Sequence, residues 1–561
     1  MLISDDKIKS ILLNVKLIDP KLLDETVEYA KNSDISLGDA LIEKDIVTDE
    51  NLGMLTADTL KIPFIVLGKI TIPEEVFRII PERMARKHKA IPFLRDSQGI
   101  RVAMANPNDN LILEMITRKT GERAFSYYAT ERDIYSKLWI YRRDLQKTFD
   151  AIINEQIIVA GKAVTKTAPV AKIVELIINY SYQDRTSDIH IEPQEENTLI
   201  RFRIDGILHD VLVLPKKLHD QIITRIKVLA SLRTDEHMAP QDGKMRISLE
   251  EEELDIRVSI LPIVYGEKIV CRLLASRFRQ FSLVDLGMRE SDLKKVTSGF
   301  KKSFGMVLST GPTGSGKTTS IYAILKIINT REKNITTIED PVEYRMKGVN
   351  QIQTNPKANL TFASGLRSVL RQDPNIIFVG EIRDSETAGI AVNAALTGHL
   401  VLSTLHTNDA ATALPRLSDM GVEPFLVAST VNVIVAQRLL RKICEMCKSS
   451  IDVKRQDFAK NLPSEVVTKH FGEKDDIRIY KGQGCAVCHH SGYSGRVGVF
   501  EVLEVTNNIR KLITQKADAD VILAQAIKDD DMTTMLDDGL IKVKQGVTTI
   551  EEVLRVTKVG E

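Results

Sequence analysis

Several features of membrane and nucleic-acid proteins are missing from this chain of 561 residues. Its 77 Lys and Arg nearly cancel its 76 Asp and Glu, so the overall basic field of a dedicated nucleic-acid binder is absent. No apolar run approaches membrane-spanning length, since VNVIVA, one of the longest, stops at Gln437. The first ten residues lack the basic and apolar regions of a signal peptide. We therefore expect a cytoplasmic protein without direct membrane insertion, peripheral to a membrane only through protein partners.

Cysteine is also scarce, and four of the five cysteines form two Cys-x-x-Cys pairs. Without an export signal, this spacing favours a metal over disulfides. Two pairs complete a tetrahedral sulfur site for Zn²⁺ with no open position, so the zinc should be structural. The 37 residues between the pairs exceed a compact zinc ribbon, which predicts a small inserted subdomain. Unmetallated thiols are the alternative. The expected ligands are Cys444, Cys447, Cys485 and Cys488, while Cys271 lies in an apolar strand and should be core.

Length and pattern divide the chain into several domains, because 561 residues exceed what one hydrophobic core usually organises. In the first sixty residues, apolar positions such as Ile8, Leu12 and Leu23 recur 29 residues later, which indicates paired short helices. From about Phe281, apolar strands alternate with helices, which indicates an α/β core with buried parallel strands. The expected parts of this multidomain α/β protein are a helical repeat (1–61), an α+β module (62–145), a linker (146–168), a domain with half-buried antiparallel strands (169–279), the α/β core (280–442), the cysteine subdomain (443–500) and a helical region (501–561).

One segment, MVLSTGPTGSGKTTSIYAILKII, predicts a nucleotide site. The strand Met306–Thr310 runs into a glycine-rich loop and then into an apolar-periodic helix. Glycines allow a tight loop whose N–H groups cradle phosphates, backed by the positive end of the helix. Lys317 should reach the β- and γ-phosphates, and Thr318 should ligate Mg²⁺, so ATP and Mg²⁺ are the expected cofactors. A chance match in a glycine-rich turn is the alternative. The expected nucleotide-contacting residues are Gly311, Pro312, Thr313, Gly314, Ser315, Gly316, Lys317, Thr318 and Thr319.

Polar residues follow the next apolar strands. NITTIEDPVEY places Glu339, Asp340 and Glu343 after one strand, and NIIFVGEIRD places Glu381 after another. Because the carboxyl ends of parallel strands line the ligand crevice, we expect both groups to face the phosphates. Carboxylates that cap helices or solvate loops are the alternative. Two histidines, His399 and His406, flank a further strand, where a structural role competes with a catalytic one.

At this point the chain resembles the secretion and pilus-assembly ATPase family. The family's Walker A segment GPTGSGKTT, Asp box TIEDPVEY, Walker B segment FVGEIRD and His box TGHLVLSTLHTNDA appear in family order. The resemblance continues upstream through SDIHIEP, RFRIDG, APQDGKM and VYGEKIVCRLL, and downstream to GRVGVFEVLEV. It covers essentially Ala171–Val505, with a weaker match at the N-terminus.

The resemblance implies a ring-shaped homohexamer in which each chain joins a PAS-like N2 domain to a RecA-like P-loop ATPase core. It places Thr318 and Glu381 around magnesium. It leaves Glu339 and Glu381 as two candidates for the water-activating base. Because RecA-type enzymes usually carry that base on the strand between Walker A and Walker B, we assign the role to Glu339, and Glu381 then orients the ion. The His-box residues His399 and His406 are carried over as catalytic candidates.

Ring ATPases of this type resemble one another in bringing arginines to the nucleotide. In TLIRFRID, the apolar residues Ile200, Phe202 and Ile204 alternate, which leaves Arg201 and Arg203 together on the other strand face. Planar guanidinium groups there suit phosphate stabilisation. A solvated strand face is the alternative.

Two features point to a branch of the family. Retraction motors resemble the catalytic half but lack both the tetracysteine element and the long N-terminal region. This favours pilus assembly or type II secretion. The residues 62–145 resemble the N-terminal secretion-ATPase module, and 1–61 resemble the MshEN-like domain that binds cyclic di-GMP in some pilus ATPases. That domain's motif begins Arg-Leu-Gly, whereas KIK and SLG stand here, and both later glycines are replaced, by Lys16 and Asp45. These replacements count against cyclic di-GMP binding, while the helical fold is expected to be kept.

The resulting prediction is a motor that couples ATP hydrolysis to type IV pilus assembly, with an inner-membrane platform protein and cytoplasmic accessory proteins as partners. A type II secretion ATPase is the main alternative. A hexameric helicase would share the P-loop core, but no basic, aromatic-interleaved stripe accompanies it, so no nucleic acid is expected. A noncatalytic nucleotide-binding scaffold is the third alternative, against which Lys317, Glu339 and Glu381 argue.

Overall fold

A computed structural model describes residues 5–15, 18–33, 36–44, 46–141, 170–249, 253–274, 282–459, 462–485 and 488–557. The expected linker 146–168, Lys16 and Asp45 lie outside these residues. The chain divides into two compact units, described separately below. Unit 1 contains Met1–Leu60, Phe281–Gln483 and Gly492–Glu561, and unit 2 contains Lys61–Gln280 and Gly484–Ser491. In the described ranges, no helix combines the length and apolarity needed to cross a membrane.

Unit 1 is built around a seven-stranded sheet with strand order β12-β11-β13-β14-β10-β15-β18. Six strands are parallel, and β18 joins β15 in antiparallel register. This confirms the buried parallel strands expected from residue 281 onward, since every residue of β10, β11, β13 and β14 is buried. The strands are β10 (Gly305–Thr310), β11 (Ile335–Glu339), β12 (Asn350–Gln353), β13 (Ile376–Val379), β14 (Leu400–Leu405), β15 (Val431–Ile443) and β18 (Tyr493–Glu504).

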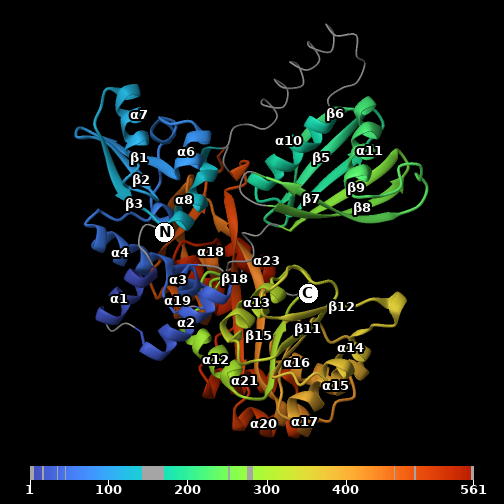
Figure 1. The fold of residues 1–561 in the computed structure, drawn as a ribbon. Helices are drawn as coiled ribbons and strands as arrows, with labels where there is room; N and C mark the ends of the chain where they lie inside the picture. The colour runs from blue at the N-terminus through green and yellow to red at the C-terminus, as the bar shows by residue number, and fades with distance from the viewer. Residues whose placement is uncertain are drawn as a thin grey trace. The chain divides into compact units, whose positions relative to one another are not determined.

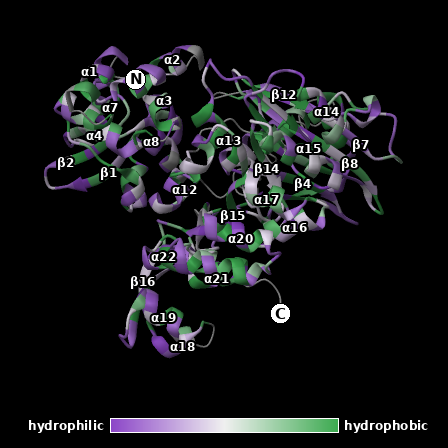
Figure 2. Ribbon diagram, turned by 90° about the horizontal axis from the view of Figure 1, so that it is seen from below, coloured by the Kyte–Doolittle hydropathy of each residue, from purple (hydrophilic) through white to green (hydrophobic). Residues whose placement is uncertain are grey.

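Two apolar clusters join this sheet to its helices. One contains α13 side chains such as Ile321 and Tyr322, and the other contains side chains of α15 and of the C-terminal helices. Hydrophobic and hydrophilic residues both occur along α21 and α22, as expected of helices buried on one side (Figure 2). The helices are α12 (Glu290–Lys301), α13 (Lys317–Ile328), α14 (Phe362–Val369), α15 (Ser385–Leu396), α16 (Ala413–Asp419), α17 (Pro424–Thr430), α20 (Asn507–Thr514), α21 (Ala519–Asp529), α22 (Met535–Lys544) and α23 (Ile550–Thr557).

Between β15 and β18 the chain forms a small excursion. The strands β16 (Lys448–Lys454) and β17 (Asp476–Gly482) pair in antiparallel register, with α18 (Arg455–Ala459) and α19 (Ser464–Phe471) between them. At the N-terminus of unit 1, the repeat forms four helices around a small apolar core. They are α1 (Asp5–Val15), α2 (Pro20–Ser33), α3 (Leu37–Glu43) and α4 (Asp49–Leu60).

Unit 2 contains two sheets. The smaller has the order β1-β2-β3, with β1 (Ala90–Asp96), β2 (Gly99–Met104) and β3 (Ala124–Tyr128). Short helices accompany it: α5 (Glu74–Phe77), α6 (Glu82–His88), α7 (Asn110–Thr120) and α8 (Glu131–Lys137). The predicted strand at Ile100–Met104 and the helix at Leu111–Thr117 are therefore present, whereas the helix expected over Glu74–Ile80 ends at Phe77.

The larger sheet is antiparallel throughout, with the order β6-β5-β4-β9-β8-β7. The helices α10 (Val170–Gln183) and α11 (His219–Leu229) cover one face (Figure 1) and share an apolar core with it. In β5, Ile200 and Phe202 point into this core, as the alternation predicts, and Cys271 is buried there too. The strands are β4 (Asp188–Pro193), β5 (Asn197–Ile204), β6 (Ile207–Pro215), β7 (Gln241–Ser248), β8 (Glu253–Ile263) and β9 (Gly266–Leu274).

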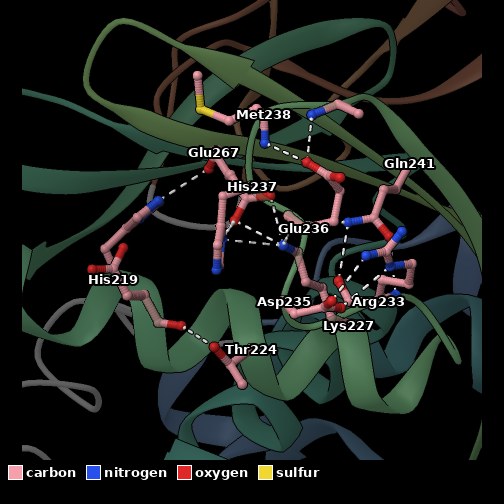
Figure 3. A network of polar contacts seen from close by, with 12 residues as sticks. His219, Thr224, Lys227, Arg233, Asp235, Glu236, His237, Met238, Gln241 and Glu267 are labelled. Atoms are coloured by element: carbon pink, nitrogen blue, oxygen red, sulfur yellow. Dashed lines mark hydrogen bonds and ion pairs between the residues drawn. The ribbon is translucent and has the colours of Figure 1, made fainter.

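A buried ion pair ties α11 to β9 and to the segment that follows α11 (Figure 3). The Lys227 ammonium is fully buried and lies 2.7 Å from the Glu267 carboxylate. It also donates to the Glu236 carbonyl at 2.6 Å, and His237 contacts Glu267 at 2.7 Å. His219 contacts the Glu267 carbonyl at 3.0 Å. A buried charge requires such partners, so this network fixes the segment between α11 and β7.

Candidate nucleotide site and metal centre

The predicted phosphate loop lies between β10 and α13, in the expected strand-loop-helix order. Its three glycines, Gly311, Gly314 and Gly316, have positive φ, a backbone conformation that residues with a side chain rarely adopt. A Cβ on Gly311 would also lie 2.5 Å from the Gln437 carbonyl oxygen of β15. The loop therefore needs glycine for its backbone conformation and for its close packing against β15.

The Lys317 side chain lies inside this loop. Its ammonium is largely buried and donates to the carbonyls of Gly311 at 2.8 Å and Pro312 at 3.1 Å. Burial lowers the pKa of Lys317, and the negative charge of Glu381 opposes that shift. Lys317 thus carries its charge within the loop, where the phosphate-binding lysine of a P-loop is expected.

Glu381 follows β13 and is mostly buried, with 11% of its side chain exposed. His406 approaches its carboxylate at 3.2 Å and Arg383 at 2.6 Å. The Glu381 carboxylate and the Thr318 hydroxyl next to Lys317 are hard oxygen donors of the kind that Mg²⁺ prefers. The predicted magnesium ligands are therefore compatible with this end of the sheet, and His406 belongs to the same cluster.

Glu339 has different surroundings. It ends β11, three strands from β10 in the sheet order, which corresponds to a lateral separation of about 14 Å. Only 2% of the residue is exposed, and its carboxylate accepts from Thr337 at 2.6 Å, from Gln351 at 3.2 Å and from the Tyr322 hydroxyl of α13. Burial raises the pKa of Glu339, although these hydrogen bonds oppose the shift. To activate water, Glu339 would have to exchange one of these partners.

The two candidate histidines lie at opposite ends of β14. The backbone of His399 pairs with Gly305 at the start of β10, and its ring contacts the Ala394 carbonyl at 2.9 Å. The phosphate loop follows the other end of β10, so a six-residue strand, about 20 Å long, separates His399 from the loop of its own chain. Only His406 of this pair joins the cluster at Glu381.

Arg201 and Arg203 lie on the polar face of β5 in unit 2, as predicted from the alternation. Both are paired with carboxylates of the neighbouring strand β4. Arg201 lies 2.8 Å from Glu192, and Arg203 lies 3.5 Å from Asp188. Either guanidinium would have to leave or share its carboxylate to bind a phosphate.

Sequence reasoning missed Gln437, which supports the loop from β15. Its side-chain amide is buried and donates to the Ser315 carbonyl at 2.8 Å. The only signal available was that a polar residue ends the buried run VNVIVA without ending the strand. Tyr322 was also missed, because a tyrosine on an apolar helix face gives no indication that its hydroxyl meets Glu339.

The four predicted zinc ligands are gathered in one place, where their sulfur atoms all lie within 4.8 Å of one another. Cys485 and Cys488 are 3.7 Å apart at sulfur, close to the roughly 3.8 Å expected between sulfurs of a tetrahedral zinc site with 2.3 Å bonds. Two backbone hydrogen bonds join the chain around the first pair to the chain around the second: Gln483 donates to the Cys447 carbonyl, and Cys444 donates to the Gly492 carbonyl. The donor set therefore fits a structural Zn²⁺, with both pairs contributing.

The chain matches the model of the type II/IV secretion system protein family over residues 163–555 and the MshEN domain model over residues 60–139. The second match covers the three-stranded module and begins where the helical repeat ends. The likeness proposed between the repeat itself and an MshEN domain stays a prediction.

Relatives of this chain include pilus and secretion ATPases. The chain is 36% identical to the type IV pilus assembly ATPase PilB of Myxococcus xanthus, with 98% of each chain covered. It is 44% identical to the type II secretion system protein E of Dickeya dadantii, with 70% of this chain and 76% of the relative covered. Among solved structures, the Legionella pneumophila ATPase DotB matches with a TM-score of 0.50 at 20% identity, covering 70% of this chain and 97% of that chain. At that identity the likeness concerns the fold alone, and it supports the RecA-like ATPase fold predicted for the core.

Proposed function

The chain belongs to the type II/IV secretion system protein family, and we propose that it is the motor ATPase that drives assembly of a type IV pilus. Catalytically it is an ATP hydrolase. The observation that carries the proposal is the Walker A loop closed around Lys317, with Glu381 following β13 of the same parallel sheet. The extent of similarity favours pilus assembly, since 98% of the chain aligns with the pilus ATPase and 70% with the secretion ATPase.

Lys317 supplies the positive charge that binds the β- and γ-phosphates, and the residues from Gly311 to Thr319 enclose them. Thr318 and Glu381 would hold Mg²⁺, which when bound would neutralise charge on the phosphates. His406 orients the Glu381 carboxylate, and Glu339 remains our candidate for the base. Glu343, four residues beyond Glu339 and only partly buried, competes with it on grounds of access to water.

Three glutamine variants test these roles. The amide keeps the shape of the side chain but accepts no proton, so the variant of the true base should bind ATP and lose turnover. We expect Glu339→Gln to bind ATP and lose turnover. Lys317→Ala should lose both turnover and nucleotide binding. Normal turnover by Glu339→Gln, together with loss in Glu343→Gln or Glu381→Gln, would move the base to the residue whose variant is inactive.

The rest of the proposed assembly follows the family. Six chains form a ring, unit 2 provides the PAS-like N2 domain, and Arg201 and Arg203 contact nucleotide. His399 has a role outside the phosphate site of its own chain. The motor is cytoplasmic and reaches the inner membrane through a platform protein and accessory proteins. It carries one structural Zn²⁺ and binds no nucleic acid, so DNA should leave its ATPase rate unchanged.

A type II secretion ATPase is the second candidate, favoured by the higher identity, 44%, over the shared part of the chain. Deletion in the native host separates the two. Loss of surface pili with normal protein export supports the proposal, and loss of export with normal pili supports the alternative.

A further inference from the structure

The loop of residues 406–410, between β14 and α16, connects directly to the nucleotide site. His406 contacts the Glu381 carboxylate. The next residue, Thr407, donates its backbone N–H to the Thr310 hydroxyl at 2.9 Å, and the two hydroxyls lie 2.6 Å apart. Thr310 is the last residue of β10, immediately before the phosphate loop. The position of this loop therefore sets the position of His406 relative to Glu381.

Glu501 of β18 holds the far end of this loop. The residue is 4% exposed, and one oxygen of its carboxylate accepts the backbone N–H of Ala410 at 2.9 Å. The other oxygen accepts the N–H of Met535, the first residue of α22, at 3.3 Å. Burial raises the pKa of Glu501 to about 6, the two N–H groups oppose that shift, and Asp409 adds to it. One buried side chain thus joins the loop to the start of a C-terminal helix.

Such an arrangement costs free energy unless both oxygens are satisfied, because a buried carboxylate loses its hydration. Neither Ala410 nor Met535 is a neighbour of Glu501 in sequence, so the contact fixes three separate segments relative to one another. A small loop displacement near reacting groups can lower a rate by about a hundredfold. The buried Glu501 carboxylate is therefore in a position to control the geometry at His406, because it fixes the loop that carries this histidine.

We propose that Glu501 is a positioning residue for ATP hydrolysis, which holds Ala410 so that His406 and Thr407 stay aligned with Glu381 and Thr310. The proposal rests on the proposed ATPase function. It concerns turnover more than nucleotide affinity, because affinity comes from the phosphate loop itself.

The test is steady-state ATP hydrolysis by the full-length Glu501→Gln variant. The amide keeps the size of the side chain but points its NH₂ group at one of the two backbone N–H groups that the carboxylate accepts. We expect kcat to fall tenfold or more while KM for ATP changes by less than twofold. Glu501→Asp, which keeps the charge on a shorter side chain, should give an intermediate kcat and replaces the glutamine variant if that one fails to fold.

Asp538→Asn is the matched control. Asp538 is fully buried and lies on α22, the helix that begins at Met535. Its carboxylate accepts the N–H of Phe500, the residue before Glu501, at 2.9 Å. Its other partners are Lys542 and Arg289. We expect this control to melt at lower temperature yet keep its kcat when measured well below that temperature. A wild-type kcat in Glu501→Gln, or an equal loss of kcat in Asp538→Asn, would overturn the proposal.

Hydrogen exchange of the peptide 406–412 gives a readout independent of catalysis. The Ala410 amide should exchange at least tenfold faster in Glu501→Gln than in the wild type or in Asp538→Asn. Unchanged exchange at Ala410 would overturn the proposal even if kcat fell. If the wild-type chain did not hydrolyse ATP, the proposed function would fail, while the exchange result would still show whether Glu501 holds the loop.

Discussion

Replacing Lys227 by methionine tests whether the buried ion pair of unit 2 is essential to its stability. Lys227 is fully buried and contacts Glu267, the Glu236 carbonyl and His237 (Figure 3). Methionine fills nearly the same space, so the substitution removes the charge and its hydrogen bonds with little change in packing. Glu267, 9% exposed at its side chain, then keeps His237 but loses its main cation.

Removing one partner of a buried ion pair costs about 3–5 kcal/mol, because the remaining charge is left in a poorly solvated place. Since 1.4 kcal/mol corresponds to about a tenfold change in an equilibrium constant, local opening should become roughly a hundred to several thousand times more frequent. A single melting temperature is poorly defined in a multidomain chain. Hydrogen exchange of α11 and β9 peptides reads the local opening directly.

Two further variants make this prediction refutable. Lys216→Met removes a lysine of the same module that donates to the exposed carbonyls of Gln194 and Tyr265, and it should cost about 1 kcal/mol or less. The double variant Lys227→Met/Glu267→Leu should recover most of the lost stability, because a well-packed apolar pair often replaces a buried ion pair without net cost. The reasoning is refuted if Lys227→Met exchanges like Lys216→Met, or if the double variant is no better than the single one.

Three other predictions concern zinc, arginine and acid. Protein purified without chelator should contain one zinc per chain by elemental analysis, and Cys444→Ser should lose the metal and melt lower, since thiolate ligation contributes folding free energy. Mixed rings of Arg203→Ala and Lys317→Ala chains should recover ATPase activity that neither variant shows alone, if Arg203 acts on a neighbouring chain; mixed rings without recovery would contradict this. The third prediction concerns the buried Glu552. Burial alone would raise its pKa, but hydrogen bonds from Arg555 and Arg441 outweigh burial and lower the pKa to about 2. Its stabilisation, about 3 kcal/mol, should be complete above the unfolded pKa near 4.5 and disappear as pH falls to about 2, measured as faster exchange of α23.

The nucleotide loop and the zinc ligands were predictable from sequence because their chemistry is local. A P-loop is a contiguous segment, and its glycines, lysine and flanking elements all lie within about twenty residues of one another. The two Cys-x-x-Cys turns are also short, so only their meeting depended on the fold. The polar face of β5 followed from simple alternation around Ile200 and Phe202, both of which are buried.

Sequence reasoning was weaker wherever the order of strands decides the outcome. The sequence places His399 and His406 seven residues apart, yet β14 carries them to opposite ends of the sheet. It also showed nothing of Glu501, whose two donors come from positions 410 and 535. A glutamate in the apolar strand VGVFEVLE could have been noticed as a candidate buried charge, but its partners required the structure.

The same sheet order bears on the division of labour between the two glutamates. β13 lies two strands from β10, and the negative charge of Glu381, which follows it, opposes the lowering of the Lys317 pKa by burial. β11 lies one strand farther, and Glu339 at its end is satisfied by Tyr322, Thr337 and Gln351. A base must accept a proton from water at the moment of attack, so a carboxylate with three protein donors must first give one up. Tyr322 is the donor best placed to do so, because it lies on α13, the helix that begins at Lys317 and on which we propose the phosphates bind. If Glu339 is the base, Tyr322→Phe should therefore change turnover, whereas loss of turnover confined to Glu381→Gln or Glu343→Gln would make the Tyr322–Glu339 contact a structural one.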